Sequence, residues 1–312
     1  MRERKKAVRR MPSKDRAAGV LSTGFCLLVL LAIAFIILMP FLDKLSVVFQ
    51  GYEDLMDATV KYIPKNPTLG TLKETVTATN YWSALLNTTV LSLLSAVLQM
   101  FSCAFIAYGF ANFKFPGKRL LFIVTLAILI IPPQLLMSPY YTKFRYFDIL
   151  GIIQGVTGHS LNLVNSYWPF IILSVTGLGL KNSLYIYLFR QYYCNLPRQL
   201  EEAGYVDGAG TLRIFFRIIL PNAKALMITV FLFAFTWQWS DSTYTNILVP
   251  TRPVLSTILG HISLYKIETI EPVVRSAMVN TAILLIILPL VLLYAFTQRY
   301  FIEGVERSGI VG

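Results

Sequence analysis

Long apolar runs separated by short polar stretches extend along the sequence from Leu21 to Gln298. A helix needs about 20 mostly apolar residues to cross a bilayer core. Six runs meet this requirement, at residues 21–42, 85–110, 120–142, 161–189, 223–240 and 276–298. The first run is too long for the apolar core of a signal peptide and no small-residue cleavage site follows it, so we expect a retained span. The pattern predicts an all-α integral membrane protein with six transmembrane helices.

The polar stretch between the fourth and fifth runs contains the signals of two short helices joined by a turn. Pro197 suits the first turn of a helix, and Glu201 and Glu202 follow it where the helix dipole favours carboxylates. Asp207-Gly208 is a turn pair, because glycine accepts the positive φ that many turns require. A second helix is expected from Ala209 to Ile219. Its apolar face would consist of Leu212, Phe215, Phe216 and Ile219.

Composition and charge agree with a membrane protein and predict its orientation. Hydrophobic residues make up 55% and charged residues 14%, with a mean hydropathy of +0.61, whereas soluble chains carry about 25% charged residues. The net charge is +12. Because cytoplasmic segments collect Lys and Arg, the residues before Leu21 predict a cytoplasmic N-terminus; they include Arg2, Arg4, Lys5, Lys6, Arg9, Arg10, Lys14 and Arg16. We expect contact with the bilayer rather than nucleic acid, because no basic groove with interleaved aromatic residues is evident.

The predicted spans contain almost no ionisable side chains, and Lys181 in the fourth run is the one candidate. Intramembrane charges usually mark proton relays and ion sites, so their scarcity argues against an ion-coupled secondary carrier. A phosphate-binding Walker A sequence is also absent, since Asn112 stands where a Gly would have to precede Gly117-Lys118. If the chain moves a solute uphill, we therefore expect the energy to come from a separate ATPase chain, and the polar loop 190–221 is the candidate docking site for it.

A motif with fixed spacing lies in this loop. Glu202-Ala203-Gly204 is followed at regular offsets by Gly208, by Ile218 and by Leu220-Pro221. This spacing resembles the EAA signature of ABC-importer permeases, with Gly204 in place of the second Ala. Glu202 would be the polar anchor in a cleft of the ATPase, Ala203 and Gly204 would permit close seating, and Gly208 would form the turn.

Segments outside the loop extend the resemblance from about Trp82 to the end of the chain. The chain resembles the carbohydrate, or maltose-permease-like, group of binding-protein-dependent ABC importers. The segments that carry this resemblance are Tyr108–Ala111, Phe113–Arg119, Ile131–Gln134, Phe189–Gln191 and Gly304–Gly312. Ser308 and Val311 depart from the terminal pattern.

The resemblance implies a type I ABC importer permease fold with a cytoplasmic coupling helix, in a bacterial or archaeal plasma membrane. Expected partners are a second permease subunit in a heterodimer, two copies of an ATPase that binds ATP and Mg²⁺, and an extracytoplasmic solute-binding protein. The coupling residues would be Glu201, Glu202, Ala203, Gly204, Asp207, Gly208 and Ala209. The expected organisation is a basic tail (1–20), a first span (21–42), an outer loop (43–82), a permease core (83–300) and a cytoplasmic tail (301–312).

The solute path is predicted less directly. One polar stripe follows the second run at helical spacing and consists of Thr88, Ser92, Ser95, Gln99 and Ser102. Small polar residues are typical of helix packing in membranes, but Ser95 and Gln99 could also face a solute path. Pro132-Pro133 interrupts the third run, and backbone freed at membrane depth is tolerated beside a cavity, so Gln134 is a further candidate. Trp237 and Trp239 could stack on sugar rings, although aromatic residues at a span end are usually interfacial anchors.

No catalytic arrangement is found in the sequence. His159 and His261 lie in different predicted outer loops, which argues against a metal site, and Cys26, Cys103 and Cys194 offer no plausible disulfide. The sequence therefore predicts a non-catalytic transport subunit that binds no cofactor itself. A sugar or oligosaccharide is the expected solute. The alternative solutes are a polyol or a glycerophosphate. The alternative classes of protein are an ion-coupled carrier and a membrane scaffold or channel, and the last two would have no associated nucleotide-binding subunit.

Overall fold

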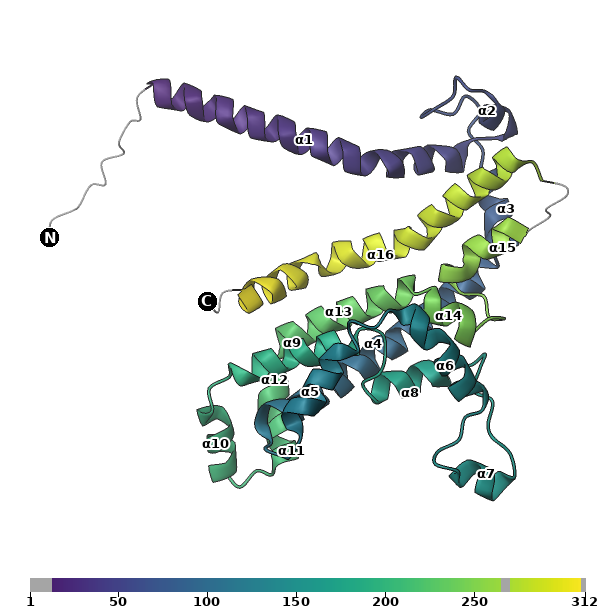
Figure 1. The fold of residues 1–312 in the computed structure, drawn as a ribbon. Coiled ribbons are helices and arrows are strands. Elements are labelled where there is room, and N and C mark those ends of the chain that lie inside the picture. Colours follow the sequence, from purple (N-terminus) through teal and green to yellow (C-terminus); the bar gives the residue numbers. More distant parts are fainter. Residues whose placement is uncertain (1–12, 265–269, 310–312) are drawn as a thin grey trace.

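The computed structural model describes residues 13–264 and 270–309, and these residues are helical apart from connecting loops and one isolated β-bridge between Phe147 and Leu161 (Figure 1). The basic residues before Ser13 and the tail position Val311 lie outside the described residues. The helices are α1 (Ser13–Phe49), α2 (Tyr52–Met56), α3 (Gly70–Ala78), α4 (Tyr81–Asn112), α5 (Lys118–Ala127), α6 (Pro133–Arg145), α7 (Ile152–Thr157), α8 (Trp168–Val175), α9 (Asn182–Cys194), α10 (Gln199–Val206), α11 (Thr211–Ile214), the π-turn η1 (Phe215–Ile219), α12 (Leu220–Asn222), α13 (Lys224–Ser240), α14 (Thr243–Leu248), the 3₁₀ turn η2 (Leu255–Thr257), α15 (Ile258–Leu264) and α16 (Pro272–Gly309).

The centre of the fold is α4, which packs against α13 on one side and against α8 and α9 on another. Alanines give α4 its close contacts: Ala84, Ala96, Ala104 and Ala107 are all fully buried. Small side chains let helix backbones approach closely, which is how helices associate where no water drives them together. The polar face of α4 also turns inward, so the predicted stripe lies within this packed centre.

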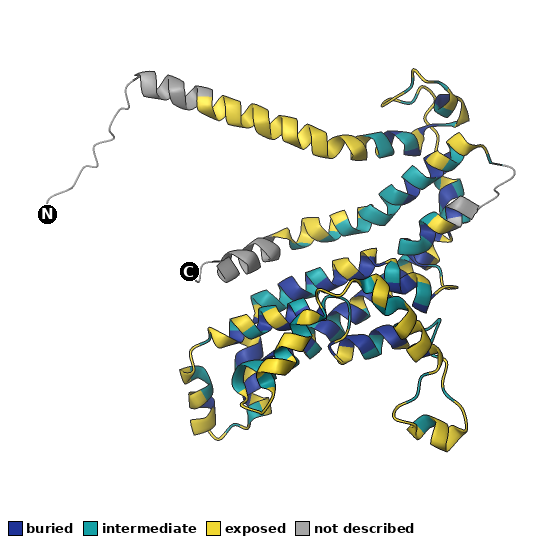
Figure 2. Ribbon diagram, viewed as in Figure 1, coloured by how far each residue is buried: buried dark blue, intermediate teal, exposed yellow. Residues whose placement is uncertain are grey.

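Helix α1 differs from the central bundle in that its apolar surface is uncovered (Figure 2). Side chains such as Leu28 (65% exposed) and Ile36 (70% exposed) have no cover within the chain. Only the C-terminal part of α1 is held, where Lys44 Nζ donates to Asn280 Oδ1 of α16 at 2.8 Å. The helix is longer at both ends than the predicted span 21–42.

Two of the predicted spans are interrupted. Segment 120–142 forms α5 and α6, with a break before Pro133 whose missing N–H cannot continue the helical hydrogen bonds. Segment 161–189 forms α8 and α9, and the break between them contains Gly177 (φ +78°) and Lys181 (φ +62°). The third run was predicted to break at its prolines, but the prediction of an uninterrupted fourth helix is wrong.

Three described helices are long and apolar enough to cross a membrane on their own: Ser22–Phe49, Tyr81–Asn112 and Pro272–Gln298. A fourth candidate is the pair Thr211–Asn222 and Lys224–Ser240, which is bent by 80°. Helix α13 begins one residue after the predicted start of its span, and α4 and α16 contain the predicted second and sixth spans. Among the described residues, the length and composition of single helices thus account for three or four of the six predicted transmembrane helices.

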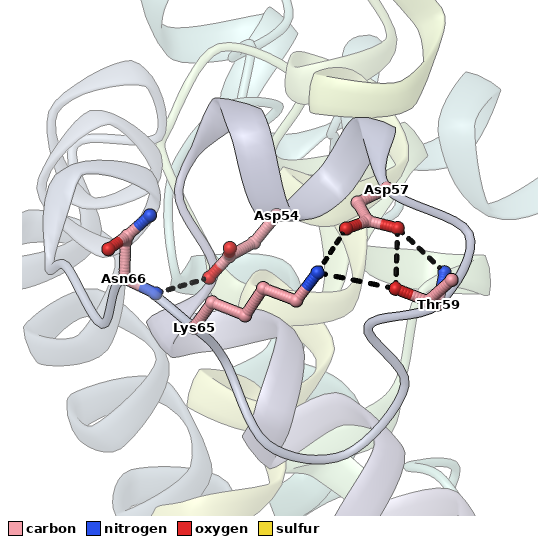
Figure 3. Close-up of polar contacts among 5 residues, drawn as sticks. All are labelled: Asp54, Asp57, Thr59, Lys65 and Asn66. Atoms are coloured by element: carbon pink, nitrogen blue, oxygen red, sulfur yellow. Dashed lines mark hydrogen bonds and ion pairs between the residues drawn. The ribbon is translucent and has the colours of Figure 1, made fainter.

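Several polar side chains in the segment between α1 and α3 bind one another (Figure 3). The buried Asp54 carboxylate accepts the backbone N–H of Asn66 at 3.0 Å. The Asp57 carboxylate forms an ion pair with Lys65 and accepts both the N–H and the hydroxyl of Thr59, at 2.9 and 2.7 Å. These contacts give the Asp54 and Asp57 carboxylates partners from the same segment.

Candidate functional site

Helix α10 contains the carboxylates of the spaced motif and ends in a hydrogen-bonded turn at Gly208. The N–H of Ala209 donates to Gly204 O and that of Gly208 donates to Tyr205 O, both at 3.0 Å. Gly208 has φ +74°, the left-handed conformation that such a helix end requires and that glycine adopts without strain. The predicted turn is confirmed. A Cβ on Gly208 would meet nothing within 4 Å, so the glycine serves the backbone conformation and not a packing contact.

Gly204 has a different role from the predicted one. It is buried, and a Cβ at this position would lie 2.9 Å from Ile214 Cγ1 and 3.0 Å from Ile218 Cδ1. The absent side chain therefore lets α10 lie against the following helical segment of the same chain. Close seating of another protein on Gly204 itself is incompatible with this burial, whereas Ala203 is exposed and remains available.

The two adjacent glutamates differ in environment. Glu201 is half-buried and accepts a hydrogen bond from the Asn112 amide at the C-terminal end of α4. Glu202 is exposed, and its carboxylate has no hydrogen bond or ion pair among the described residues. Glu201 therefore ties α10 to the bundle, and Glu202 is the carboxylate that is free to meet a partner.

The segment after the turn is packed less regularly than predicted. Ile214, Phe215 and Ile219 are buried, but Leu212 and Phe216 are 60% and 55% exposed, so the predicted apolar face is wrong for these two. Phe216 lies within the π-turn η1, whose wider helical turn changes the direction of its side chains relative to an α-helix. Leu212 and Phe216 remain one turn apart on the outer surface.

A sharp bend connects this surface to the core. The axis of Thr211–Asn222 meets that of α13 at 80°, and the fully buried Ala223 lies at the bend. The Tyr192 hydroxyl of α9 donates to Asn222 O at 2.6 Å, which fixes the corner. The bend thus joins the segment that contacts α10 to α13, which packs along α4.

The predicted path residues Ser95 and Gln99 lie inside the chain between α4 and the α8–α9 break. Gln99 Nε2 is 3.5 Å from Ser174 Oγ, and a Cβ on Gly179 would come within 2.9 Å of that amide. Ser95 Oγ and Gln99 Oε1 are buried without a hydrogen-bond partner among the described residues. Gln134, by contrast, is exposed at the start of α6. The three residues do not form one surface.

The sequence analysis missed a small pocket where the two helix breaks meet. It has a volume of about 60 Å³ and is lined by Tyr140, Lys181, Asn182 and Tyr244 among others. Lys181 Nζ lies 4.8 Å from the centre of the Trp237 ring, which connects the break to α13. The glycines at 177 and 179, inside an apolar run, are the signal that could have located this break.

The two tryptophans of α13 have separate environments. Trp237 is 43% exposed, whereas Trp239 is 2% exposed and donates its indole N–H to Ile286 O of α16 at 3.1 Å. Trp239 therefore joins α13 to α16 and is neither an interfacial anchor nor available for sugar stacking.

Among the described residues, no group of three or more His, Cys, Asp or Glu side chains is placed to hold a metal ion. Cys26, Cys103 and Cys194 are free thiols. The chemically distinctive surface of the described chain is therefore the exposed part of α10 and its turn.

A bundle of long and broken apolar helices with a protruding polar helix pair defines a membrane transport subunit. The chain belongs to the family described as binding-protein-dependent transport system inner membrane component, whose sequence model matches residues 100–307. It is a multi-pass permease subunit of an ABC importer.

Similar proteins support this assignment. The galactooligosaccharides transport system permease protein GanQ of Bacillus subtilis (strain 168) is 28% identical over 92% of this chain and 95% of its own length. The osmoprotective compounds uptake permease protein GgtD of Synechocystis sp. is 28% identical over 90% of each chain. A solved chain of a bacterial ABC transporter that imports the acidic polysaccharide alginate has the same fold, with a TM-score of 0.69 and 17% identity over 93% of this chain and 98% of its own.

Proposed function

We propose that this chain is one of two different permease subunits that, with two ATPase copies and an extracytoplasmic binding protein, import an oligosaccharide. Exposed α10 would seat in a cleft of one ATPase. The observation that carries this proposal is that the motif residues Glu202, Ala203 and Gly208 lie on the exposed part of α10 and its turn, while Glu201 and Gly204 hold that helix to the chain. ATP and Mg²⁺ would be bound by the ATPase, and this chain would be a non-catalytic subunit.

In the proposed topology the chain crosses the membrane six times and both termini are cytoplasmic. The crossings would be α1, α4, the pairs α5–α6 and α8–α9, α13 and α16, because each pair covers more than the ~20 residues that a span requires. Broken helices occur inside membranes where protein or a cavity satisfies the freed backbone groups. Helix α10 would then lie on the cytoplasmic side.

The proposed movement begins when the ATPase dimer closes on ATP. It would displace α10 and α11 together, because Gly204 packs against Ile214 and Ile218. The bend at Ala223 would pass this displacement to α13, and the bundle would rock between inward-open and outward-open states. Such rigid-body transmission requires a stiff corner, and the Tyr192–Asn222 hydrogen bond provides it.

The oligosaccharide assignment rests on relatives, such as the galactooligosaccharides permease protein. Relatives also include a permease protein for osmoprotective compounds, so a polyol or a glycerophosphate is the second candidate class. Ser95, Gln99 and Gln134 remain proposed path residues. Uncovering the buried Ser95 and Gln99 would require α4 and the α8–α9 break to separate during the cycle.

The test is reconstitution of the purified complex in liposomes, with labelled oligosaccharides, polyols and glycerophosphate presented in turn with the binding protein. We expect uptake of an oligosaccharide that requires ATP on the ATPase side. If a polyol or glycerophosphate is taken up and no oligosaccharide is, the solute belongs to the second candidate class. Uptake that continues without ATP, driven by an ion gradient, would contradict the importer mechanism.

A further inference from the structure

A pocket of about 680 Å³ lies between the start of α5 and α9, apart from the motif helix and the helix breaks. Three cationic side chains line it: Lys118, Arg119 and Arg190. Apolar side chains complete it, among them Leu120, Phe122 and Ile123. The pocket is therefore amphipathic, with its charges at the first turn of α5 and its apolar residues further along that helix.

The positive charges of this pocket have no acidic partner. Within the part of the chain that the structure describes, the one close ion pair is Lys65–Asp57. Lys118 Nζ donates to the backbone oxygens of Ala111 and Phe113, at 3.3 and 2.9 Å, which fixes the ammonium group in place. Carbonyl oxygens orient this cation but do not neutralise it.

Arg190 strengthens the argument from a second helix. Its guanidinium lies 4.3 Å from the centre of the Phe122 ring, so the ring covers one face of the cation. Its Nε is buried and has no hydrogen-bond partner among the described residues. A buried donor without an acceptor is costly, so the described residues leave the Arg190 guanidinium both unneutralised and incompletely hydrogen-bonded.

The start of α5 adds to the same field. No side chain caps this helix, and Gly117 precedes it with φ +75°. The backbone N–H groups of a first helical turn attract anions, because the helix dipole is positive there. The charges of Lys118 and Arg119 therefore reinforce the helix dipole instead of opposing it.

The apolar half distinguishes between possible anions. Leu120 is 65% exposed and Ile123 is 54% exposed, on a helix that belongs to a predicted span. A free phosphate ion would leave these side chains uncovered. The Lys118 contact with Ala111 also places the pocket next to Asn112, which binds Glu201 of α10. The pocket thus lies at the α10 end of the bundle, which is cytoplasmic in the proposed topology.

We propose that this pocket binds an anionic phospholipid, whose phosphodiester contacts Arg119 and Arg190 and whose acyl chains lie along Leu120 and Ile123. Basic pockets on the cytoplasmic side of membrane helices have the chemistry to bind such headgroups. The lipid phosphate supplies the negative charge that the pocket lacks, and the acyl chains cover the exposed leucine and isoleucine.

Native mass spectrometry of the assembled transporter tests this proposal, with phosphatidylglycerol and phosphatidylcholine of identical acyl chains offered in equal amounts. The variant Arg119→Gln/Arg190→Gln removes two cations but leaves Lys118 on its carbonyls. The variant Lys114→Gln is the matched control, because Lys114 is exposed in the loop that precedes α5 but does not line the pocket. Arg119→Gln alone covers the case in which the double variant does not assemble, since Arg119 is exposed.

We expect the unaltered transporter to retain phosphatidylglycerol in preference to phosphatidylcholine. The double variant should lose that preference by roughly tenfold or more, because each Lys or Arg near an anionic lipid contributes about a fivefold effect. The single variant should lose about fivefold, and Lys114→Gln should retain the preference. Equal retention of both lipids by the unaltered transporter, or an undiminished preference in both Arg119 variants, would overturn the proposal. Displacement of the lipid by millimolar inorganic phosphate would show a phosphate site and would overturn the lipid assignment.

Discussion

The outer segment between α1 and α3 and the helix pair α10–α11 are both polar interruptions in an apolar chain, but they treat their charges in opposite ways. In the outer segment, Asp54 and Asp57 find partners in Asn66, Lys65 and Thr59 (Figure 3). In α10, the Glu202 carboxylate has no hydrogen bond or ion pair among the described residues, and Val206, one turn further on, is 88% exposed. Asp54 and Asp57 in the first segment are satisfied within that segment, whereas the Glu202 carboxylate in the second segment is exposed.

This difference distinguishes a structural loop from a docking surface. Both segments have charged residues, so composition does not separate them. What separates them is whether the charged side chains have hydrogen-bond or ion-pair partners within the chain. In α10 the Glu201 carboxylate is hydrogen-bonded to Asn112, and Gly204 packs against Ile214. The outward residues are held in place by them, which is what a partner with a fixed cleft requires.

The largest expected effect comes from the turn that orients the open surface. Gly208→Val should abolish transport and loosen the ATPase, because a β-branched residue is strongly disfavoured at φ +74°. Gly208→Asn is the matched control, because Asn tolerates the left-handed conformation and space is open there. Uptake assays and co-purification of the ATPase measure both effects. Full transport by Gly208→Val would contradict the claim that the turn after α10, unlike the outer segment, orients a docking surface.

A second variant sharpens the contrast within α10. Glu202→Lys should weaken binding of the ATPase by about tenfold or more, because a hydrogen bond to a charged group contributes about 1.5–3 kcal/mol. Glu201→Gln should change that affinity little, since an amide oxygen can still accept from Asn112. Titration of the detergent-purified permease with the ATPase gives both constants. Equal losses in the two variants would contradict separate roles for the neighbouring glutamates.

The effect of Gly204→Ala on stability shows whether Gly204 faces a partner or packs within the chain, because the two possibilities predict changes of opposite sign. If this residue only faced a partner, Gly204→Ala would stabilise α10 by up to about 1 kcal/mol through helix propensity. Its Cβ would instead lie 2.9 Å from Cγ1 of the buried Ile214, and overpacking of this kind costs about 1–3 kcal/mol. We expect a lower Tm for the purified subunit. A higher Tm would show that α10 does not lean on Ile214.

The smallest effect is expected in the outer segment. The Lys65 ammonium and the Thr59 hydroxyl hold the pKa of the Asp57 carboxyl well below its usual range. A carboxyl with a lowered pKa contributes its stabilisation above its unfolded pKa and loses it only as the pH falls through the folded pKa. The mobility of a nitroxide at Tyr62→Cys should therefore stay unchanged from pH 7 to pH 4. Asp57→Asn in the same labelled chain should be more mobile at both pH values.

Local patterns in the sequence predicted the parts of the fold that depend on local chemistry. The start of α13, the break at Pro133 and the positive φ of Gly208 follow from apolar length, a missing N–H and a glycine turn. The exposure of Glu202 could also be anticipated, because an unpaired carboxylate in a polar loop is normally solvated.

The remaining features depend on contacts between segments. Gly204 is inward because Ile214 folds back onto it, and Trp239 is buried because α16 offers the Ile286 carbonyl. The π-turn at Phe215–Ile219 shifts the exposed face by a rotation that no helical periodicity encodes. The break between α8 and α9 has only its glycines as a local signal.

The central claim is that the exposed part of α10 contacts the ATPase, and a site-directed cross-link tests it most directly. Cys26 and Cys194 are first replaced by Ser, whereas Cys103 is kept because it is buried. The test variant is then Val206→Cys, and the control is Thr59→Cys in the outer segment. In the assembled transporter, a cross-linker with a maleimide at one end and a photoreactive group at the other should link position 206 to the ATPase. The yield of this product should change when ATP is added, and position 59 should give no such product. An active transporter in which position 206 never links to the ATPase would contradict the account.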